Sequence, residues 1–204
     1  MRDRSEDPVL KANWARIERE DWERTLAQRE SLRLQCLTRG NVPERFWAVL
    51  KHPNKTDAVE AMRVFLEAPP ECVFLLLSGG RGTGKTFAGS LAVQERGGYL
   101  IEAQDLALRV FDKDLWWNLE REHLVFIDEL GSEFKSEPFY AQFYALLNAR
   151  YGRLRKTVLA TNLNAEAFRL RYPDPRLLER LRTAGTWVNV QGDSMRQHWA
   201  ETEK

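Results

Sequence analysis

One segment of the chain has the spacing of a phosphate-binding loop, because G-x-x-x-x-G-K-[ST] matches residues 79–86. The apolar run Cys72–Leu77 before it is typical of a buried strand, and Thr86–Val93 after it is typical of a helix. In that setting, backbone N–H groups and the positive helix end face a phosphate chain. Lys85 is expected to reach the β- and γ-phosphates, and the Thr86 hydroxyl to hold Mg²⁺. The predicted nucleotide-binding residues are Gly79, Gly80, Arg81, Gly82, Thr83, Gly84, Lys85, Thr86 and Phe87.

A second segment places two acids directly after an apolar strand. Leu124–Ile127 is apolar, and Asp128 and Glu129 follow it. Because parallel sheets bind ligands at the carboxyl ends of their strands, Asp128 is predicted to orient Mg²⁺ beside the loop. Glu129 is predicted to polarise the attacking water. The alternative is that both acids end a strand at the surface. An interval of roughly 43 residues from the phosphate loop favours the functional interpretation.

Polar residues at two further positions are candidates for contact with phosphate. Asn162 ends the next apolar strand and is predicted to contact the γ-phosphate or the water, although asparagine there is also ordinary turn chemistry. Arg176 and Arg180 lie four residues apart on a helix predicted at 175–182. Arginine binds phosphate through a fixed set of donors, so one of them is a candidate to act on a neighbouring subunit's nucleotide. The alternative, which the residues alone favour, is a solvated basic face that pairs with Glu179.

The elements that must position these residues alternate between strands and helices from Cys72 onward. This alternation predicts an α/β fold with a parallel sheet. Apolar spacing also predicts helices at 57–67 and 138–151, and Pro43 is expected to open another. The five strands are predicted at Cys72–Ser78, Tyr99–Glu102, Leu124–Asp128, Thr157–Thr161 and Thr186–Gln191.

The composition is that of an ordinary globular protein. The chain has 204 residues, enough for one domain with a sizeable core and a short appendage. Its 31 Lys+Arg and 30 Asp+Glu give a net charge of +1, so overall charge does not indicate nucleic acid. Two cysteines are too few for a disulfide framework and favour a reducing compartment. No signal peptide or membrane-length apolar run is visible, so we expect a cytoplasmic protein without a membrane partner.

The N-terminal stretch, residues 9–37, contains no Gly or Pro and predicts one or two amphipathic helices. Residues 40–43 end the pattern, which predicts a helical partner-binding region at 1–40 and an ATPase domain at 41–204. Aromatic anchors on such a helix suit a groove on a partner, and packing on its own ATPase domain is the alternative. Leu10, Trp14 and Ile17 share one face of the predicted helix, and Trp22 and Leu26 continue that face after a shift in register.

Taken in order, these motifs resemble the DnaC/IstB branch of the AAA+ ATPases, which includes replicative helicase loaders and transposase-helper ATPases. The resemblance covers about residues 39–197. The phosphate loop alone occurs in many families. Three other motifs are more specific: the two acids followed by Leu-Gly at 128–131, N-x-R-Y at 148–151 and G-x-S-x-R at 192–196. The matching segments are 40–46, 79–86, 126–131, 148–151, 157–163, 180–182 and 192–196.

The resemblance implies an AAA+ P-loop NTPase domain with a five-stranded parallel sheet flanked by helices and no C-terminal lid. It also implies ATP and Mg²⁺ as cofactors, with a homo-oligomer that holds ATP between subunits. Arg180 would be an arginine finger acting in trans, and Arg196 a second phosphate-sensing residue.

The same resemblance implies contact with single-stranded DNA through two segments. The family carries a nucleic-acid-binding insert that is abbreviated here to Ala103–His123, and the loop after the acidic strand is the second segment. Aromatic residues beside basic ones suit single strands, although packing in the core or at an interface is the alternative. The candidates are Arg109, Phe111, Lys113, Trp116, Trp117, Lys135, Ser136 and Phe139.

The leading functional hypothesis is therefore an ATP-dependent loader that assembles on single-stranded DNA and delivers a replicative helicase, gripped by the N-terminal helices. An IstB-like transposition helper with a transposase partner is the alternative within the same fold. A small-molecule P-loop kinase belongs to another class, and it predicts a substrate pocket and a lid instead of Arg180 acting across an interface. A further alternative is an adaptor that binds ATP without turnover.

Overall fold

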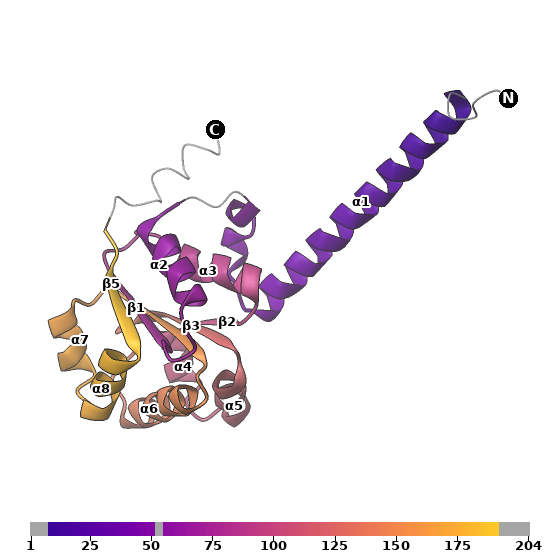
Figure 1. The fold of residues 1–204 in the computed structure, drawn as a ribbon. Helices are drawn as coiled ribbons and strands as arrows, with labels where there is room; N and C mark the ends of the chain where they lie inside the picture. Colours follow the sequence, from indigo (N-terminus) through magenta and orange to yellow (C-terminus); the bar gives the residue numbers. More distant parts are fainter. Residues whose placement is uncertain (1–7, 52–54, 192–204) are drawn as a thin grey trace.

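A computed structural model describes residues 8–51 and 55–191, with side chains described from Arg19 onward. Its first element is a single helix of 32 residues, α1 (Pro8–Arg39), where the sequence predicts one or two. Figure 1 shows α1 projecting away from the rest of the molecule. Residues 19–29 on this helix are exposed.

A five-stranded parallel sheet forms the centre of the molecule, with strand order β2-β3-β4-β1-β5. All five predicted strands are present, so the predicted α/β class is confirmed. Because every strand runs the same way, the carboxyl ends of β1, β3 and β4 meet at one edge. The strands are β1 (Phe74–Ser78), β2 (Tyr99–Glu102), β3 (Leu124–Leu130), β4 (Lys156–Thr161) and β5 (Gly185–Asn189).

Helices cover both faces of the sheet, with α2 and α3 on one face and α4, α5 and α6 on the other (Figure 1). The helix predicted from Pro43 is instead two 3-10 turns, η2 (Glu44–Phe46) and η3 (Val49–Lys51). The indole of Trp47 donates to the carbonyl of Val42, and Phe46 and Leu50 are buried in the core. The remaining helices are α2 (Asp57–Glu67), α3 (Lys85–Arg96), α4 (Ala103–Leu108), α5 (Lys113–Arg121), α6 (Glu137–Gly152), α7 (Ala165–Arg171) and α8 (Pro175–Thr183).

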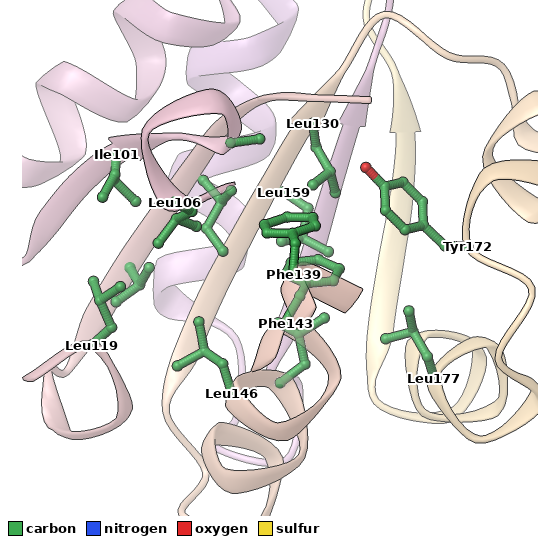
Figure 2. Close-up of a cluster of buried hydrophobic side chains, with 14 of the residues drawn as sticks. Ile101, Leu106, Leu119, Leu130, Phe139, Phe143, Leu146, Leu159, Tyr172 and Leu177 are labelled. Atoms are coloured by element: carbon green, nitrogen blue, oxygen red, sulfur yellow. The ribbon is translucent and has the colours of Figure 1, made fainter. Parts of the chain in front are cut away.

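The core consists of two apolar clusters, one on each face of the sheet. Successive residues of β1 point to opposite faces, so Phe74 and Leu76 join one cluster while Leu75 and Leu77 join the other. The cluster that lies against α4, α5 and α6 is shown in Figure 2. A sheet covered on both faces explains why its central strands are continuous apolar runs.

The last turns of α1 pack against the body of the protein. Leu37 is fully buried, and the guanidinium of Arg33 donates to the Trp47 carbonyl and, at 2.9 Å, to Oε1 of Gln94 on α3. Trp22, further along α1, is 59% exposed. The side chains of Leu10, Trp14 and Ile17 lie outside the described residues, so the division at residue 40 stays a prediction.

Among the described residues, no helix has both the length and the apolar character that crossing a bilayer requires. In the same part of the chain no lid domain follows β5.

Candidate functional site

The phosphate loop joins β1 to α3 and contains glycines where other residues would not fit. Gly84, which precedes the first residue of α3, has φ 89°, a left-handed conformation that favours glycine. A Cβ atom on Gly79, at the other end of the loop, would lie 2.3 Å from the carbonyl oxygen of Val190. The backbone is thus shaped so that the N-terminus of α3 opens into a cleft.

Lys85 and Thr86, at the start of α3, point toward the ends of two other strands. The Lys85 ammonium donates to the carbonyl of Gly79 at 2.7 Å and to Oδ1 of Asn162 at 3.0 Å. The Thr86 hydroxyl donates to Oδ2 of Asp128 at 2.6 Å. Lys85 and Thr86 thus contact two residues far along the sequence, Asn162 and Asp128, and all four line one cleft.

Burial changes the protonation energetics of this cluster. Asp128 is only 3% exposed, and its removal from water raises the pKa of its carboxyl group. Burial also lowers the pKa of the Lys85 ammonium, which the negative charges of Asp128 and Glu129 oppose. Both effects penalise the charged forms, so each side chain gains from a partner of opposite charge: an anion beside Lys85 and a cation beside Asp128.

Glu129 reaches the cleft through a β-bulge in β3. Ile127 is paired with Leu159 and Leu130 with Thr161. Two residues of β3, Asp128 and Glu129, thus lie opposite one residue of β4, which is the pattern of a β-bulge. Glu129 has φ 50°, a left-handed conformation that is unusual for a residue with a side chain. Its carboxylate is exposed and lines the cleft, whereas a regular strand would alternate it to the face opposite Asp128.

These residues surround one cleft of about 420 Å³. Arg45 and Phe46, from η2, also line it, and we did not predict them as site residues. The signal that pointed to them was the 40–46 segment of the family resemblance. The lining residues are Arg45, Phe46, Arg81, Gly82, Gly84, Lys85, Thr86, Phe87, Asp128, Glu129 and Asn162.

Glu102 is another acid near the cleft that the sequence analysis did not select. It ends β2, where it is paired in register with Asp128. Burial raises the pKa of its carboxyl group, and the negative charges of Glu129, Asp105 and Asp128 raise it further. The ends of β2 and β3 therefore bring several carboxyl groups close together, and a bound cation would relieve the repulsion between them.

Arg180 does not line the cleft. It lies in a separate hollow of about 350 Å³ between α6 and α8, with its guanidinium 5.4 Å from the centre of the Tyr151 ring. Arg176 lines the same hollow and pairs with Asp174 at 3.0 Å. Glu179, expected to pair with these arginines if they were only a solvated face, instead pairs with Arg182 at 2.8 Å.

The candidate DNA-contact residues divide into packed and exposed ones. Trp116 is 5% exposed and donates its indole N–H to the Arg109 carbonyl at 3.0 Å, and Phe139 is fully buried, so both are packing residues. The Ser136 hydroxyl caps α6 by accepting from the Phe139 backbone N–H at 3.2 Å. The exposed candidates are Arg109, Phe111, Lys113, Trp117 and Lys135, and Arg109 pairs with Asp112 at 2.6 Å.

The described residues contain no group of three or more His, Cys, Asp or Glu side chains placed to hold a metal ion by themselves. The cleft does offer the Thr86 hydroxyl and the Asp128 carboxylate side by side. Mg²⁺ commonly takes one or two protein oxygens and completes its shell with water and substrate phosphates, so this pair fits it. Arg196, the remaining predicted site residue, lies outside the described residues.

No protein-family model matches the chain, and no curated protein matches it. Solved structures match it well in shape. A crystal structure of the DnaC helicase loader superposes with a TM-score of 0.58 and 17% identity, covering 73% of this chain and 100% of that one. The crystal structure of DnaI superposes with a TM-score of 0.55 and 17% identity, covering 69% of this chain and 89% of that one.

AMPPCP-bound DnaA from Aquifex aeolicus is also similar, with a TM-score of 0.61 and 18% identity over 79% of this chain. The match covers 55% of that DnaA chain, so this chain corresponds to about half of it. At these identities the similarity establishes the fold. The chain has the fold of the AAA+ replication proteins DnaC, DnaI and DnaA, and the resemblance to the DnaC/IstB branch is confirmed at that level.

Proposed function

We propose that this protein is a Mg²⁺-dependent ATPase that assembles on single-stranded DNA and delivers a replicative helicase to it. The observation that carries the proposal is the convergence of Lys85, Thr86, Asp128 and Asn162 on one cleft at the carboxyl edge of a parallel sheet. The fold shared with the DnaC helicase loader and with AMPPCP-bound DnaA supports the assignment to replication and to nucleotide binding.

In this proposal the loop residues 79–84 donate backbone N–H groups to the phosphates, and Lys85 exchanges its carbonyl contacts for the β- and γ-phosphate oxygens. Thr86 and Asp128 would hold Mg²⁺, which neutralises the charge that develops on the transferred phosphoryl group. Glu129 orients the attacking water and accepts its proton. Arg45 and Phe46 also line the cleft and are proposed to contact the nucleotide.

The family resemblance is the ground for proposing that Arg180 acts on the nucleotide of a neighbouring subunit. Its place in a hollow outside its own subunit's cleft supports this proposal. Such a head-to-tail contact makes hydrolysis depend on the oligomer. Arg196 is proposed as a second phosphate-sensing residue.

The surfaces proposed to bind partners are those where candidate side chains are exposed to solvent. The exposed part of α1, which includes Trp22 and Leu26, is proposed to bind the helicase. Phe111, Lys113 and Lys135 are exposed and are proposed to contact single-stranded DNA. Ser136 is also proposed to contact single-stranded DNA, although its hydroxyl already accepts from a backbone N–H at the start of α6.

Mixing two inactive variants tests the shared site. Arg180→Ala protein retains an intact cleft, and Lys85→Ala protein retains Arg180, so the mixture restores some complete sites and we expect hydrolysis to recover. If Arg180→Ala protein is fully active alone, or if both variants are inactive and the mixture recovers nothing, the assembly mechanism is wrong. The kinase alternative then gains support, because that class does not need Arg180 across an interface.

Capture of the partner tests the rest of the proposal. Glu129→Gln should preserve ATP binding and trap the ATP-bound assembly. We expect this variant to retain a purified replicative helicase in the presence of ATP and single-stranded DNA. Retention of a transposase instead would identify the transposition helper.

A further inference from the structure

The loop after β3 contains a buried carboxylate that the sequence did not single out. The Glu133 side chain is 0% exposed, although it lies in a loop between β3 and α6. One of its oxygens, Oε2, accepts from the backbone N–H of Gly131 at 2.8 Å. The other, Oε1, accepts from the Tyr172 hydroxyl at 2.7 Å and from the guanidinium of Arg171 at 2.8 Å.

The first of these contacts holds the turn that follows Glu129. The backbone N–H of Ser132 donates to the carbonyl of Glu129 at 2.9 Å, and Gly131, inside this turn, is held by Glu133. On the β4 side, the Thr161 hydroxyl donates to the carbonyl of Leu130 at 2.6 Å. The left-handed conformation of Glu129 costs free energy, so it persists because these neighbouring contacts define it.

The other contacts connect the turn to the chain segment that follows β4. Arg171 ends α7 and Tyr172 comes directly after it, while Asn162, which contacts Lys85, precedes α7. Arg171 also donates to the backbone carbonyl of Glu133. Tyr172 is fully buried, and in Figure 2 its hydroxyl end points toward Leu130 at the carboxyl end of β3. A single carboxylate thus joins the segments that follow the two strands from which Glu129 and Asn162 enter the cleft.

We infer that Glu133 is a positioning residue for Glu129: its carboxylate fixes the β-bulge that turns the Glu129 side chain into the nucleotide cleft. The inference deepens the proposed function and rests on it, because Glu129 matters for rate only if the cleft hydrolyses ATP. Glu133 itself does not line the cleft. Its removal therefore should alter the chemical step and leave the phosphate loop intact.

Glu133→Gln is the most direct variant, because it keeps the size of the side chain but replaces one accepting oxygen with an NH₂ group. The single amide oxygen of the glutamine can then no longer accept from both Gly131 and Tyr172, which donate to different oxygens of Glu133. We expect kcat to fall by about 10- to 100-fold, as for other residues that orient a reacting group. The KM for ATP should change by less than about threefold, since Lys85 and Thr86 are untouched.

A second variant and a matched control address folding. Tyr172→Phe removes one hydroxyl from the same cluster without changing the buried volume, and it should lower kcat in the same direction by a smaller factor. Glu137→Gln makes the same chemical change at an exposed position four residues further along, and it should leave kcat unchanged. Hydrogen exchange in all three variants reports on the bulge without requiring turnover.

Selective faster exchange at residues 129–135 in Glu133→Gln, together with a lower kcat and an unchanged KM, supports the inference. Uniformly faster exchange that includes β1 would indicate general destabilisation and would overturn it, as would a wild-type kcat. If the wild-type protein hydrolyses no ATP, the proposed function fails, and the exchange comparison still decides whether Glu133 holds the bulge.

Discussion

Substitution of Arg150 tests whether a buried cation holds the base of the sheet together. Arg150, on α6, is fully buried and donates to four acceptors. Burial lowers the pKa of its guanidinium to about 9, so it remains charged at neutral pH. The acceptors are the carbonyls of Leu119, Glu122 and Lys156 and the hydroxyl of Thr157.

The expected loss follows from these contacts. Four hydrogen bonds from a charged donor contribute on the order of 6 kcal/mol at about 1.5 kcal/mol each. Removing the cation also removes its desolvation cost, which offsets roughly half of that loss. We therefore expect Arg150→Met to lower the free energy of unfolding by about 3 kcal/mol. Arg150→Lys keeps the charge but has three donors for four acceptors, and it should cost about 1–2 kcal/mol.

Equilibrium urea denaturation, followed by tryptophan fluorescence, measures both losses. Arg153→Met is the matched control, because Arg153 is 43% exposed and pairs with Glu120 at the surface. A surface pair contributes little, so this change should cost less than about 0.5 kcal/mol. If Arg150→Met is as stable as the control, the network of Arg150 does not carry the stability assigned to it here.

Two further substitutions test the core and the cleft, and a pair of deletions tests α1. Gly89→Ala should destabilise the fold by about 1–3 kcal/mol, because its Cβ would lie 2.5 Å from the Phe126 ring. Asp128→Asn should raise the free energy of unfolding at pH 7 by about 1 kcal/mol and abolish Mg²⁺-dependent ATP binding, since it removes a buried charge. Deleting residues 1–28 should leave stability unchanged within about 0.5 kcal/mol, whereas extending the deletion through Leu37 should cost about 2–4 kcal/mol.

The Asp128 prediction has a defined pH dependence. The pKa of Asp128 is raised in the folded protein, so the folded state holds the carboxyl proton more tightly than the unfolded chain does. The free energy of unfolding therefore falls as pH rises from the ordinary pKa of the carboxyl group to its raised folded-state pKa. The advantage of Asp128→Asn should therefore disappear as pH falls to about 4, near the ordinary value. An advantage that persists there would contradict the argument. Two other results would contradict the remaining predictions. One is a wild-type urea midpoint in Gly89→Ala, and the other is a wild-type free energy of unfolding in the protein that lacks residues 1–37.

Local patterns predicted the strands and the order of the site residues, because each depends on a few adjacent side chains. The phosphate loop needs glycine, lysine and threonine at fixed spacing, and Asp128 follows an apolar run. The sheet edge then brings Lys85, Asp128 and Asn162 together without further information. The 3-10 turns after Pro43 were not predictable in this way, since apolar spacing does not distinguish them from a short α-helix.

Features set by tertiary contacts were not predictable. Adjacent Trp116 and Trp117 have the same chemistry, yet one is 5% and the other 57% exposed, because only one faces the core from α5. The bulge at Glu129 depends on pairing with β4, which the sequence of β3 does not contain. The sequence around Glu133 suggests an ordinary acid at the surface. Its burial depends on contacts with Arg171 and Tyr172, which lie far along the chain.

The helix α1 is long and projects from the body of the protein, to which it is attached near one end (Figure 1). With 32 residues it is about 48 Å long, and its described contacts with the body are made by its C-terminal turns, where Arg33 bonds to Gln94. Gln94 lies near the end of α3, the helix that begins at the phosphate loop. If this contact keeps α1 fixed to α3, a tilt of α3 moves the far end of α1 more than it moves the base, in proportion to the length of the helix.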